Sequence, residues 1–451
     1  MTRGSGPATV VLIALGGCCL TTNISSGTSA GFIVPITSSS AGASSTAAAA
    51  SSSGTTGQPL GSSSGTGTAG SSGTASGGSS TGSSSGATSG ATSSGGGTGL
   101  FFPAVNYPLD GSPHALTTFQ DDGGFVGLAT ADYSDGLVFV FSGDGDGTFH
   151  GRGPVFVAGN NGLSLQSICS ADFNNDGLAD LAISSWQGAA DNLGLLFGSG
   201  TGSGKSKFSV ADGNLDAGAT YQIISADVDN DGFADLLVIV GGDLYVGRGR
   251  GDGGFSWDPP LTNLGYMRGV AVGNFGANDL PQIAVVDNQG NQVEVLAQVD
   301  GGFSLYAAWD AGNQPVGVAA ADFNGDGCQD LAVANNLDAN LLTIFVTPCA
   351  GHALQSYSYP SECSFGQWLV TADFDGDGHQ DVAVACDAAG YQGQNVALFL
   401  GRGDGTFRDP LYYVADQGPS WIVTADFNGD GKPDLAISNL QSEDVSVLIH
   451  R

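Results

Sequence analysis

An aspartate-rich segment recurs throughout the C-terminal part of this chain. Five copies match the pattern Asp-x-Asn/Asp-x-Asp-Gly-x-x-Asp, and they begin at Asp172, Asp227, Asp322, Asp373 and Asp426. Two degenerate copies, starting at Thr118 and Asn274, fill the gaps, so that the seven starts lie 47 to 55 residues apart. A period of this length is typical of folds built from one supersecondary unit per repeat. Residues 100–451 therefore contain seven equivalent units.

Each unit contains short apolar runs separated by polar or glycine-rich turns, a pattern that predicts four strands. The chain ends after a third strand of the last unit, and residues 101–109 read as an unpaired fourth strand. Seven such repeats predict an all-β fold, a seven-bladed β-propeller of four-stranded blades that is closed by the N-terminal strand. Stacked blades bury both faces of each sheet, which accounts for 41% hydrophobic and only 12% charged residues.

The first 17 residues predict a lipoprotein signal peptide. Arg3 forms a minimal positive region, residues 8–15 are apolar, and Leu15-Gly16-Gly17-Cys18 resembles the lipobox of bacterial lipoproteins. The resemblance implies cleavage before Cys18 and lipidation of Cys18, so that the chain meets a membrane only through this anchor. An ordinary secretory signal is the alternative. Either signal places the mature chain outside the cytoplasm, as an outer-membrane or other cell-surface lipoprotein or as a secreted protein.

Residues 18–99 are predicted to be a lipid-anchored, low-complexity linker. From Thr37 to Gly99 the chain is almost wholly Ser, Gly, Thr and Ala, and such a segment cannot bury enough apolar surface to fold. We therefore expect a disordered Ser/Gly/Thr linker before the propeller, which occupies residues 100–451.

The charge balance excludes nucleic-acid binding through a basic patch. The chain has 43 Asp and Glu against 11 Lys and Arg, a formal net charge of −32, and all the acids lie in residues 110–451. Such a surface repels phosphate backbones. The five histidines are scattered, and none shares a repeat position with a serine or cysteine that would suggest a nucleophile. We therefore expect that the protein is not an enzyme. We also expect it to be a monomer.

The Asp loops predict about five Ca²⁺ sites. Alternate oxygens converge on one point, Gly permits the tight turn, and several hard oxygen ligands suit Ca²⁺. An EF-hand would need an acidic residue at position 12, where all five copies have Ile or Val; a purely polar turn is the alternative. The degenerate copies lack the charge to hold a cation, and we expect them to be empty. Side chains at positions 1, 3, 5 and 9 and the carbonyl at position 7 give the predicted ligands: Asp172, Asn174, Asp176, Leu178, Asp180; Asp227, Asp229, Asp231, Phe233, Asp235; Asp322, Asn324, Asp326, Cys328, Asp330; Asp373, Asp375, Asp377, His379, Asp381; and Asp426, Asn428, Asp430, Lys432, Asp434.

These repeats resemble the FG-GAP/VCBS repeat family, known from the propeller of integrin α-subunits and from many secreted bacterial proteins. The resemblance covers residues 100–451 and rests on the seven loops and on Gly-Asp-Gly-Thr-Phe hairpins such as residues 403–407. It implies that the Asp loops lie on the lower face and that partners dock on the upper face. Arg250-Gly-Asp252 and Arg402-Gly-Asp404 match an integrin-ligand tripeptide, but they fall in the hairpin slot and are interpreted as structural.

We therefore predict an extracellular calcium-binding propeller that acts as an adhesion or protein-interaction module, with an unknown protein or glycan as its partner. The alternative is a lectin-like, carbohydrate-binding propeller. A third interpretation is a polysaccharide lyase or phosphodiesterase-type enzyme, which a cluster of Arg, Lys or Tyr in the channel would support.

Cysteine placement in this topology predicts two disulfides, Cys328 with Cys349 on the lower face and Cys363 with Cys386 on the upper face, with free thiols as the alternative. Cys169 takes an apolar strand position and is expected to be a buried thiol. Upper-face segments hold aromatic residues that could stack on sugar rings or bind a protein, or simply fill the core, as expected for Trp368 and Trp421 at strand starts. The candidate ligand-binding residues are Trp186, Tyr266, Arg268, Trp309 and Tyr391.

Overall fold

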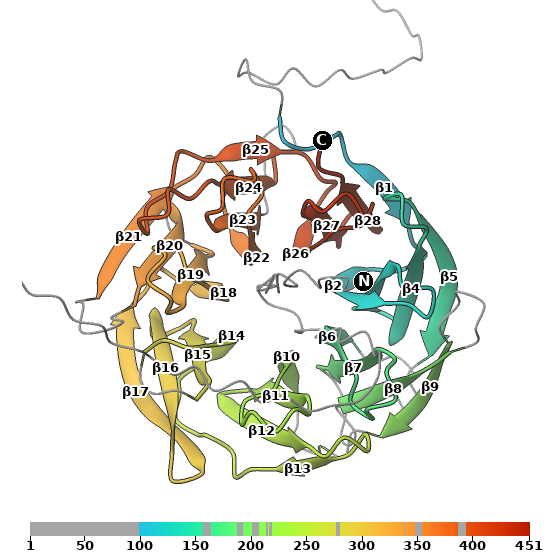
Figure 1. Cartoon of the computed structure of the whole chain (residues 1–451), viewed down its shortest axis with the longest axis horizontal. Helices are drawn as coiled ribbons and strands as arrows, with labels where there is room; N and C mark the ends of the chain where they lie inside the picture. Colours follow the sequence, from blue (N-terminus) through green and yellow to red (C-terminus); the bar gives the residue numbers. More distant parts are fainter. Residues whose placement is uncertain are drawn as a thin grey trace, which may run out of the picture. The chain divides into compact units, whose positions relative to one another are not determined.

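The computed structural model describes residues 99–156, 164–186, 193–200, 207–212, 215, 219–276, 280–337, 339–347, 354–386 and 394–451. Its strands form seven antiparallel sheets of four strands each, arranged as blades around one axis (Figure 1). This confirms the predicted all-β, seven-bladed propeller. The signal peptide, Cys18 and the linker up to residue 98 lie outside the described residues, as do Cys349 and Tyr391.

The strands follow one another from the inner to the outer edge of each blade (Figure 1). Blade 1 contains β2 (Pro113–Gln120), β3 (Val126–Asp132), β4 (Leu137–Gly143) and β5 (Phe149–Phe156); blade 2 contains β6 (Leu165–Ala171), β7 (Asp180–Ser185), β8 (Leu193–Ser199) and β9 (Lys207–Asp212). Blade 3 contains β10 (Thr220–Ala226), β11 (Asp235–Val240), β12 (Asp243–Gly249) and β13 (Phe255–Trp257); blade 4 contains β14 (Met267–Gly273), β15 (Gln282–Asp287), β16 (Gln292–Val299) and β17 (Gly302–Asp310). Blade 5 contains β18 (Pro315–Ala321), β19 (Asp330–Asn335), β20 (Asn340–Val346) and β21 (Gln355–Pro360); blade 6 contains β22 (Gly366–Ala372), β23 (Asp381–Cys386), β24 (Val396–Phe399) and β25 (Leu411–Tyr413). Blade 7 contains β26 (Pro419–Ala425), β27 (Asp434–Asn439), β28 (Asp444–Leu448) and β1 (Val105–Pro108).

The seventh blade takes its outer strand from the beginning of the propeller sequence. Strand β1 pairs antiparallel with β28, so that Val105 lies opposite Val447 and Pro108 opposite Asp444. Just before β1, the buried Phe101 packs edge-on against His450 at 5.5 Å and against Phe374 at 5.9 Å between ring centroids. Ladder hydrogen bonds and ring packing therefore join the two ends of the ring.

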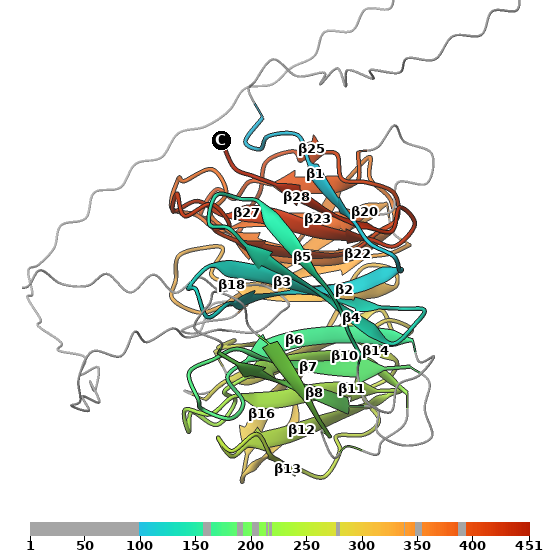
Figure 2. The ribbon, with the colours of Figure 1, turned by 90° about the vertical axis from the view of Figure 1, so that its right-hand side faces the viewer.

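The core lies between the blades rather than within a single sheet. Second strands such as β7, β11 and β27 are buried along their whole length, since neighbouring blades cover both of their faces. Figure 2 views the ring from the side, with blades 1 and 2 next to each other. Each fully buried Val, Leu, Ile or Phe contributes about 1.5–3 kcal/mol. Among the described residues, no helix is long and apolar enough to cross a membrane.

In three blades a glycine-rich hairpin contacts the preceding blade, on the face that carries the Asp loops. Gly147 donates its N–H to the Phe427 carbonyl at 3.1 Å, and the Phe149 ring meets the Phe427 ring edge-on at 5.3 Å. The same two contacts recur where Gly253 and Phe255 meet Phe173, and where Gly405 and Phe407 meet Phe323. The Arg-Gly-Asp tripeptides form the first half of the last two hairpins, so they belong to turns that connect neighbouring blades.

Every innermost strand has an irregular register next to its second residue, at the end away from the Asp loops. A β-bulge of this kind leaves one residue unpaired and re-aims its side chain. The seven bulge residues are His114, Gln166, Tyr221, Arg268, Val316, Gln367 and Ser420. The repeat thus places seven equivalent residues around the axis on the upper face.

Candidate metal centres and upper-face residues

The intact Asp loops fold through one repeated set of hydrogen bonds. In blade 2, Asp172 accepts the N–H groups of Asp176 (3.0 Å) and Gly177 (2.8 Å). Asn174 also accepts from Asp176, and Asp176 accepts from Leu178, both at 2.9 Å. The turn needs Gly177, because its φ of 83° is unfavourable for residues with a Cβ. Equivalent bonds form in the loops of blades 3, 5, 6 and 7, so the oxygens at positions 1, 3 and 5 face into each loop.

The aspartate at position 9 is buried in every intact loop. Asp180 is fully buried, and its two carboxylate oxygens accept the N–H groups of Phe173 (3.0 Å) and Gly198 (2.7 Å). Burial is the main cause that raises the pKa of Asp180 to about 7, and the neighbouring Asp176 and Asp172 raise it further. Burial also raises the pKa of Asp330 and Asp381 to about 7 and that of Asp235 and Asp434 to about 6. A bound cation would favour the ionised form of each group.

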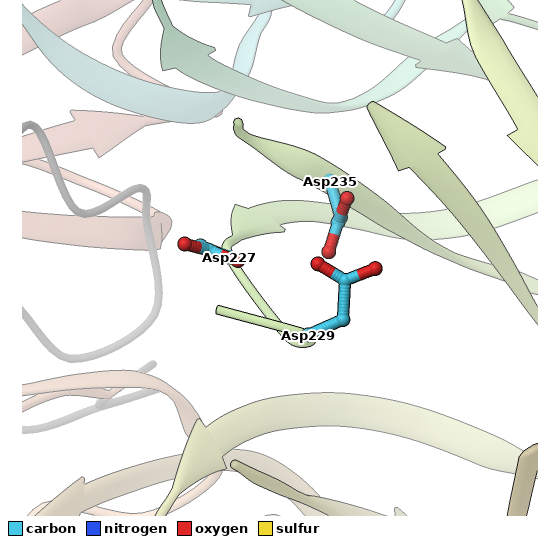
Figure 3. Close-up of side chains that lie close together, drawn as sticks. All are labelled: Asp227, Asp229 and Asp235. Atoms are coloured by element: carbon cyan, nitrogen blue, oxygen red, sulfur yellow. The ribbon is translucent and has the colours of Figure 1, made fainter. Parts of the chain in front are cut away.

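In two loops the carboxylates converge. Asp227, Asp229 and Asp235 each offer an oxygen, and these atoms lie within 4.8 Å of one another. Figure 3 shows the carboxylates of Asp229 and Asp235 facing each other. A second cluster with the same spacing contains Asp373, Asp375 and Asp377. Together the two clusters use all four predicted side-chain positions, and their donor chemistry fits a hard divalent cation such as Ca²⁺.

Each of these two loops carries a fourth aspartate and an arginine beside it. Nη1 of Arg248 lies 3.3 Å from Asp229, and Nη1 of Arg408 lies 3.2 Å from Asp375. In the other three loops the same position is an asparagine. Four aspartates and one arginine leave an excess of three negative charges, the same as the three aspartates of the loops in blades 2 and 5. Sequence reasoning missed both arginines, because they lie on strands or hairpins distant from the loops in the sequence.

Blade 4 keeps the backbone contact of position 9 but not its charge. Gln282 replaces the aspartate of position 9, and its side-chain oxygen accepts the N–H of Phe275 at 2.7 Å. The N–H of Asn274 is accepted by Gln329 of the next blade at 2.9 Å. An amide therefore fulfils the structural role of position 9 without a negative charge.

Three of the candidate ligand-binding residues come together on the upper face. Trp186, Tyr266 and Arg268 surround Tyr221, an upper-face aromatic residue that was not among the candidates. Trp309 lies instead on the outer strand β17, where its ring stacks on Phe345 at 5.9 Å. Trp368 and Trp421 are buried and stack on each other at 3.8 Å, so they fill the core between blades 6 and 7.

One of the two predicted disulfides, and the buried thiol, lie within the described part of the chain. Cys363 and Cys386 are joined by a disulfide, with 6.0 Å between their Cα atoms. Cys328 is also disulfide-bonded, while Cys349 lies outside the described residues. Cys169 is fully buried in β6. The Cys363–Cys386 bond ties the segment before β22 to the end of β23.

Two family models match the repeats. An FG-GAP-like repeat matches residues 373–437, a range that spans the loops of blades 6 and 7, and an FG-GAP repeat matches residues 315–343, which span the loop of blade 5. The chain carries FG-GAP repeats in a seven-bladed propeller. Among solved structures it is similar to BBS1N in complex with ARL6DN, soaked with mercury, with a TM-score of 0.53, 13% identity, and coverage of 78% of this chain and 97% of that chain. A second structure of that complex, soaked with lead, gives a TM-score of 0.52 and 12% identity with the same coverage. At this identity the likeness shows the fold alone.

Proposed function

We propose that this FG-GAP propeller is an extracellular interaction module whose fold is stabilised by Ca²⁺ in its five intact loops. The observation that carries the proposal is the convergence of carboxylates in the loops of blades 3 and 6. Carboxylates held this close repel one another, so a cation that binds only the folded state stabilises it. FG-GAP repeats often bind calcium, which supports the assignment.

In each loop the ion would be held by the side chains of positions 1, 3, 5 and 9 and by the carbonyl of position 7. Each oxygen that accepts one backbone N–H keeps a second lone pair for a metal. Ca²⁺ takes 6 to 8 oxygen ligands, so water would complete the set. The two positive charges of the ion offset most of the negative charge of the loop, and the upper face remains available to a partner.

The location and the partner are part of the same proposal. FG-GAP repeats occur in extracellular or cell-surface proteins and suggest a protein-interaction role. We propose that Cys18 carries the lipid anchor and that the low-complexity linker separates the propeller from the membrane. FG-GAP propellers are typically non-enzymatic, and we propose no reaction for this one.

A second candidate function, carbohydrate binding, is favoured by the aromatic and arginine side chains that meet at Tyr221. Aromatic faces and charged donors are the groups with which proteins hold sugars and their acidic substituents.

Metal stoichiometry tests the calcium proposal directly. The full chain is freed of metal, titrated calorimetrically with Ca²⁺, and compared with a variant in which Asp373, Asp375 and Asp377 are all changed to Asn. We expect about five ions per chain and one fewer for the variant. Binding of no ion by the folded wild-type chain would refute the calcium proposal.

A further inference from the structure

Four side chains from three consecutive blades form one connected group, here called the upper cluster: Trp186, Tyr221, Tyr266 and Arg268. The rings of Trp186 and Tyr221 meet edge to face at 4.5 Å, and those of Tyr221 and Tyr266 at 5.5 Å, between centroids. The two tyrosine hydroxyls are 2.6 Å apart. The guanidinium carbon of Arg268 lies 5.0 Å from the Tyr221 centroid and 5.4 Å from the Tyr266 centroid. The contacts hold the four side chains in one arrangement.

The bulges place part of the cluster near the axis of the ring. Tyr221 and Arg268 are the bulge residues of β10 and β14, as His114 is in β2. Burial is the main cause that lowers the pKa of His114, and the charge of Arg268 in blade 4 lowers it further. The Nδ1 atom of His114 lies 2.8 Å from the Gln166 carbonyl and must donate to it, which leaves Nε2 as an acceptor. His114 and Arg268 are thus equivalent residues of the repeat on the upper face.

The cluster offers hydrogen-bond donors and one uncompensated positive charge. Arg268 is exposed and forms no ion pair within the described part of the chain, whereas Arg248, Arg250 and Arg408 each lie within 4.0 Å of an aspartate. Burial and the Tyr266 hydroxyl raise the pKa of Tyr221 to about 12, so its hydroxyl stays protonated at neutral pH. One hydroxyl of the tyrosine pair donates to the other, and the second hydrogen is left for a ligand. A guanidinium that is exposed and has no carboxylate partner among the described residues can pair with an anionic group of a ligand.

We propose that the upper cluster binds an acidic sugar, a uronate within an oligosaccharide. The guanidinium would hold the carboxylate in a bidentate pair, and the rings of Trp186 and Tyr266 would pack against the C–H groups of the sugar. Four contiguous side chains match one or two sugar units, whereas a protein partner usually covers about 800 Å² on each side. The inference rests on the carbohydrate-binding candidate above and assigns its site and ligand class.

Calorimetry with a glucuronate-containing tetrasaccharide tests the inference. The full, calcium-loaded chain is titrated with this ligand and with the same tetrasaccharide after reduction of its carboxyl groups to alcohols. We expect binding of the acidic form that is about ten-fold or more tighter than that of the reduced form. Arg268→Ala should abolish this preference, Arg268→Lys should keep part of it, and Tyr221→Phe should weaken binding less than Arg268→Ala. Arg250→Ala on the lower face is the matched control and should bind like the wild type.

Each other outcome has a separate meaning. Equal affinity for the two tetrasaccharides, or unchanged binding by a folded Arg268→Ala chain, would overturn the uronate site. A chain that binds Ca²⁺ but no acidic tetrasaccharide would overturn this inference alone, and a chain that binds no Ca²⁺ would overturn the calcium proposal instead. A surface protein bound through Arg268 by a chain that ignores the sugar would also overturn the assignment. Thermal unfolding of each variant checks that it folds.

Discussion

The loops of blades 4 and 5 are neighbours that share one buried backbone contact at position 9 and differ in charge. In blade 5, Asp330 is fully buried and accepts the N–H of Phe323 at 3.0 Å; in blade 4, Gln282 is fully buried and accepts the N–H of Phe275 at 2.7 Å. Blade 4 therefore keeps an oxygen acceptor at position 9 without a negative charge there. The acids retained in five of seven loops are in excess of what the fold requires, which points to a cation.

The largest expected effect comes from removing the acceptor at position 9. Asp330→Ala leaves the N–H groups of Phe323 and Thr347 without an acceptor and also removes a proposed metal ligand. We expect it to lower the free energy of unfolding by about 3 kcal/mol or more in calcium. Gln282→Ala removes the side-chain oxygen that accepts the N–H of Phe275, and also the amide that donates to the Leu280 carbonyl; it should cost about 1–2 kcal/mol. Thermal unfolding in calcium compares the two variants. Equal losses of stability would contradict the difference proposed between the two loops.

A smaller effect is expected when the charge is removed but an acceptor is kept. Asp373→Asn retains one oxygen for the N–H groups that Asp373 accepts, while it weakens the proposed site of blade 6. We expect the free energy of unfolding to fall by about 2–3 kcal/mol in saturating calcium and by about 0.5 kcal/mol or less in chelator. Asn274→Asp in blade 4 is the control and should not create a site. Calorimetric ion counts on both variants check this, and an undiminished count for Asp373→Asn would argue against its role.

The pH dependence of stability should be opposite in metal-free and calcium-loaded protein. Burial raises the pKa of Asp180, Asp330 and Asp381 to about 7 in the folded state, against about 3.9 in an unfolded chain. The folded state therefore binds these protons more tightly, and metal-free stability is greatest at low pH and falls as pH rises through about 7. Calcium displaces the protons and should restore stability at pH 8. Melting temperatures measured at pH 5.5 and pH 8, with and without calcium, test this prediction. A metal-free protein whose melting temperature rises toward pH 8 would contradict it.

The smallest expected effect concerns the loops with a fourth aspartate. Arg408 is half exposed and pairs with Asp375 and Asp377. Because such pairs contribute about 0–1 kcal/mol, Arg408→Ala should barely change metal-free stability. It should strengthen calcium binding at blade 6, since a competing positive charge is removed. Arg402→Ala, in the same hairpin but outside these ion pairs, is the control, and a weaker calcium affinity for Arg408→Ala would show that the arginine supports the site.

The sequence predicts the repeats better than the contacts between them. The period, the strand order and the outer strand of blade 7 follow from local patterns, because each blade is one short, continuous segment. The pairing of Arg248 with Asp229 and the hydrogen bond from Phe275 to the Gln282 side chain depend on groups brought together by folding. The upper cluster is harder still to predict, because Trp186, Tyr221 and Arg268 come from three blades and two of them are re-aimed by bulges. Repeat position alone indicates the bulge residues once one blade is known.

Thermal unfolding of the full chain in saturating calcium and in chelator tests the central claim, that the excess acids of the five loops hold stabilising Ca²⁺. At a free calcium concentration 100 times the dissociation constant, each site would add about 2.7 kcal/mol. We predict a melting temperature higher by about 10 °C or more in calcium, with no comparable rise in magnesium. Superimposable unfolding curves in calcium and in chelator would contradict the account and would leave the Asp loops as acidic turns.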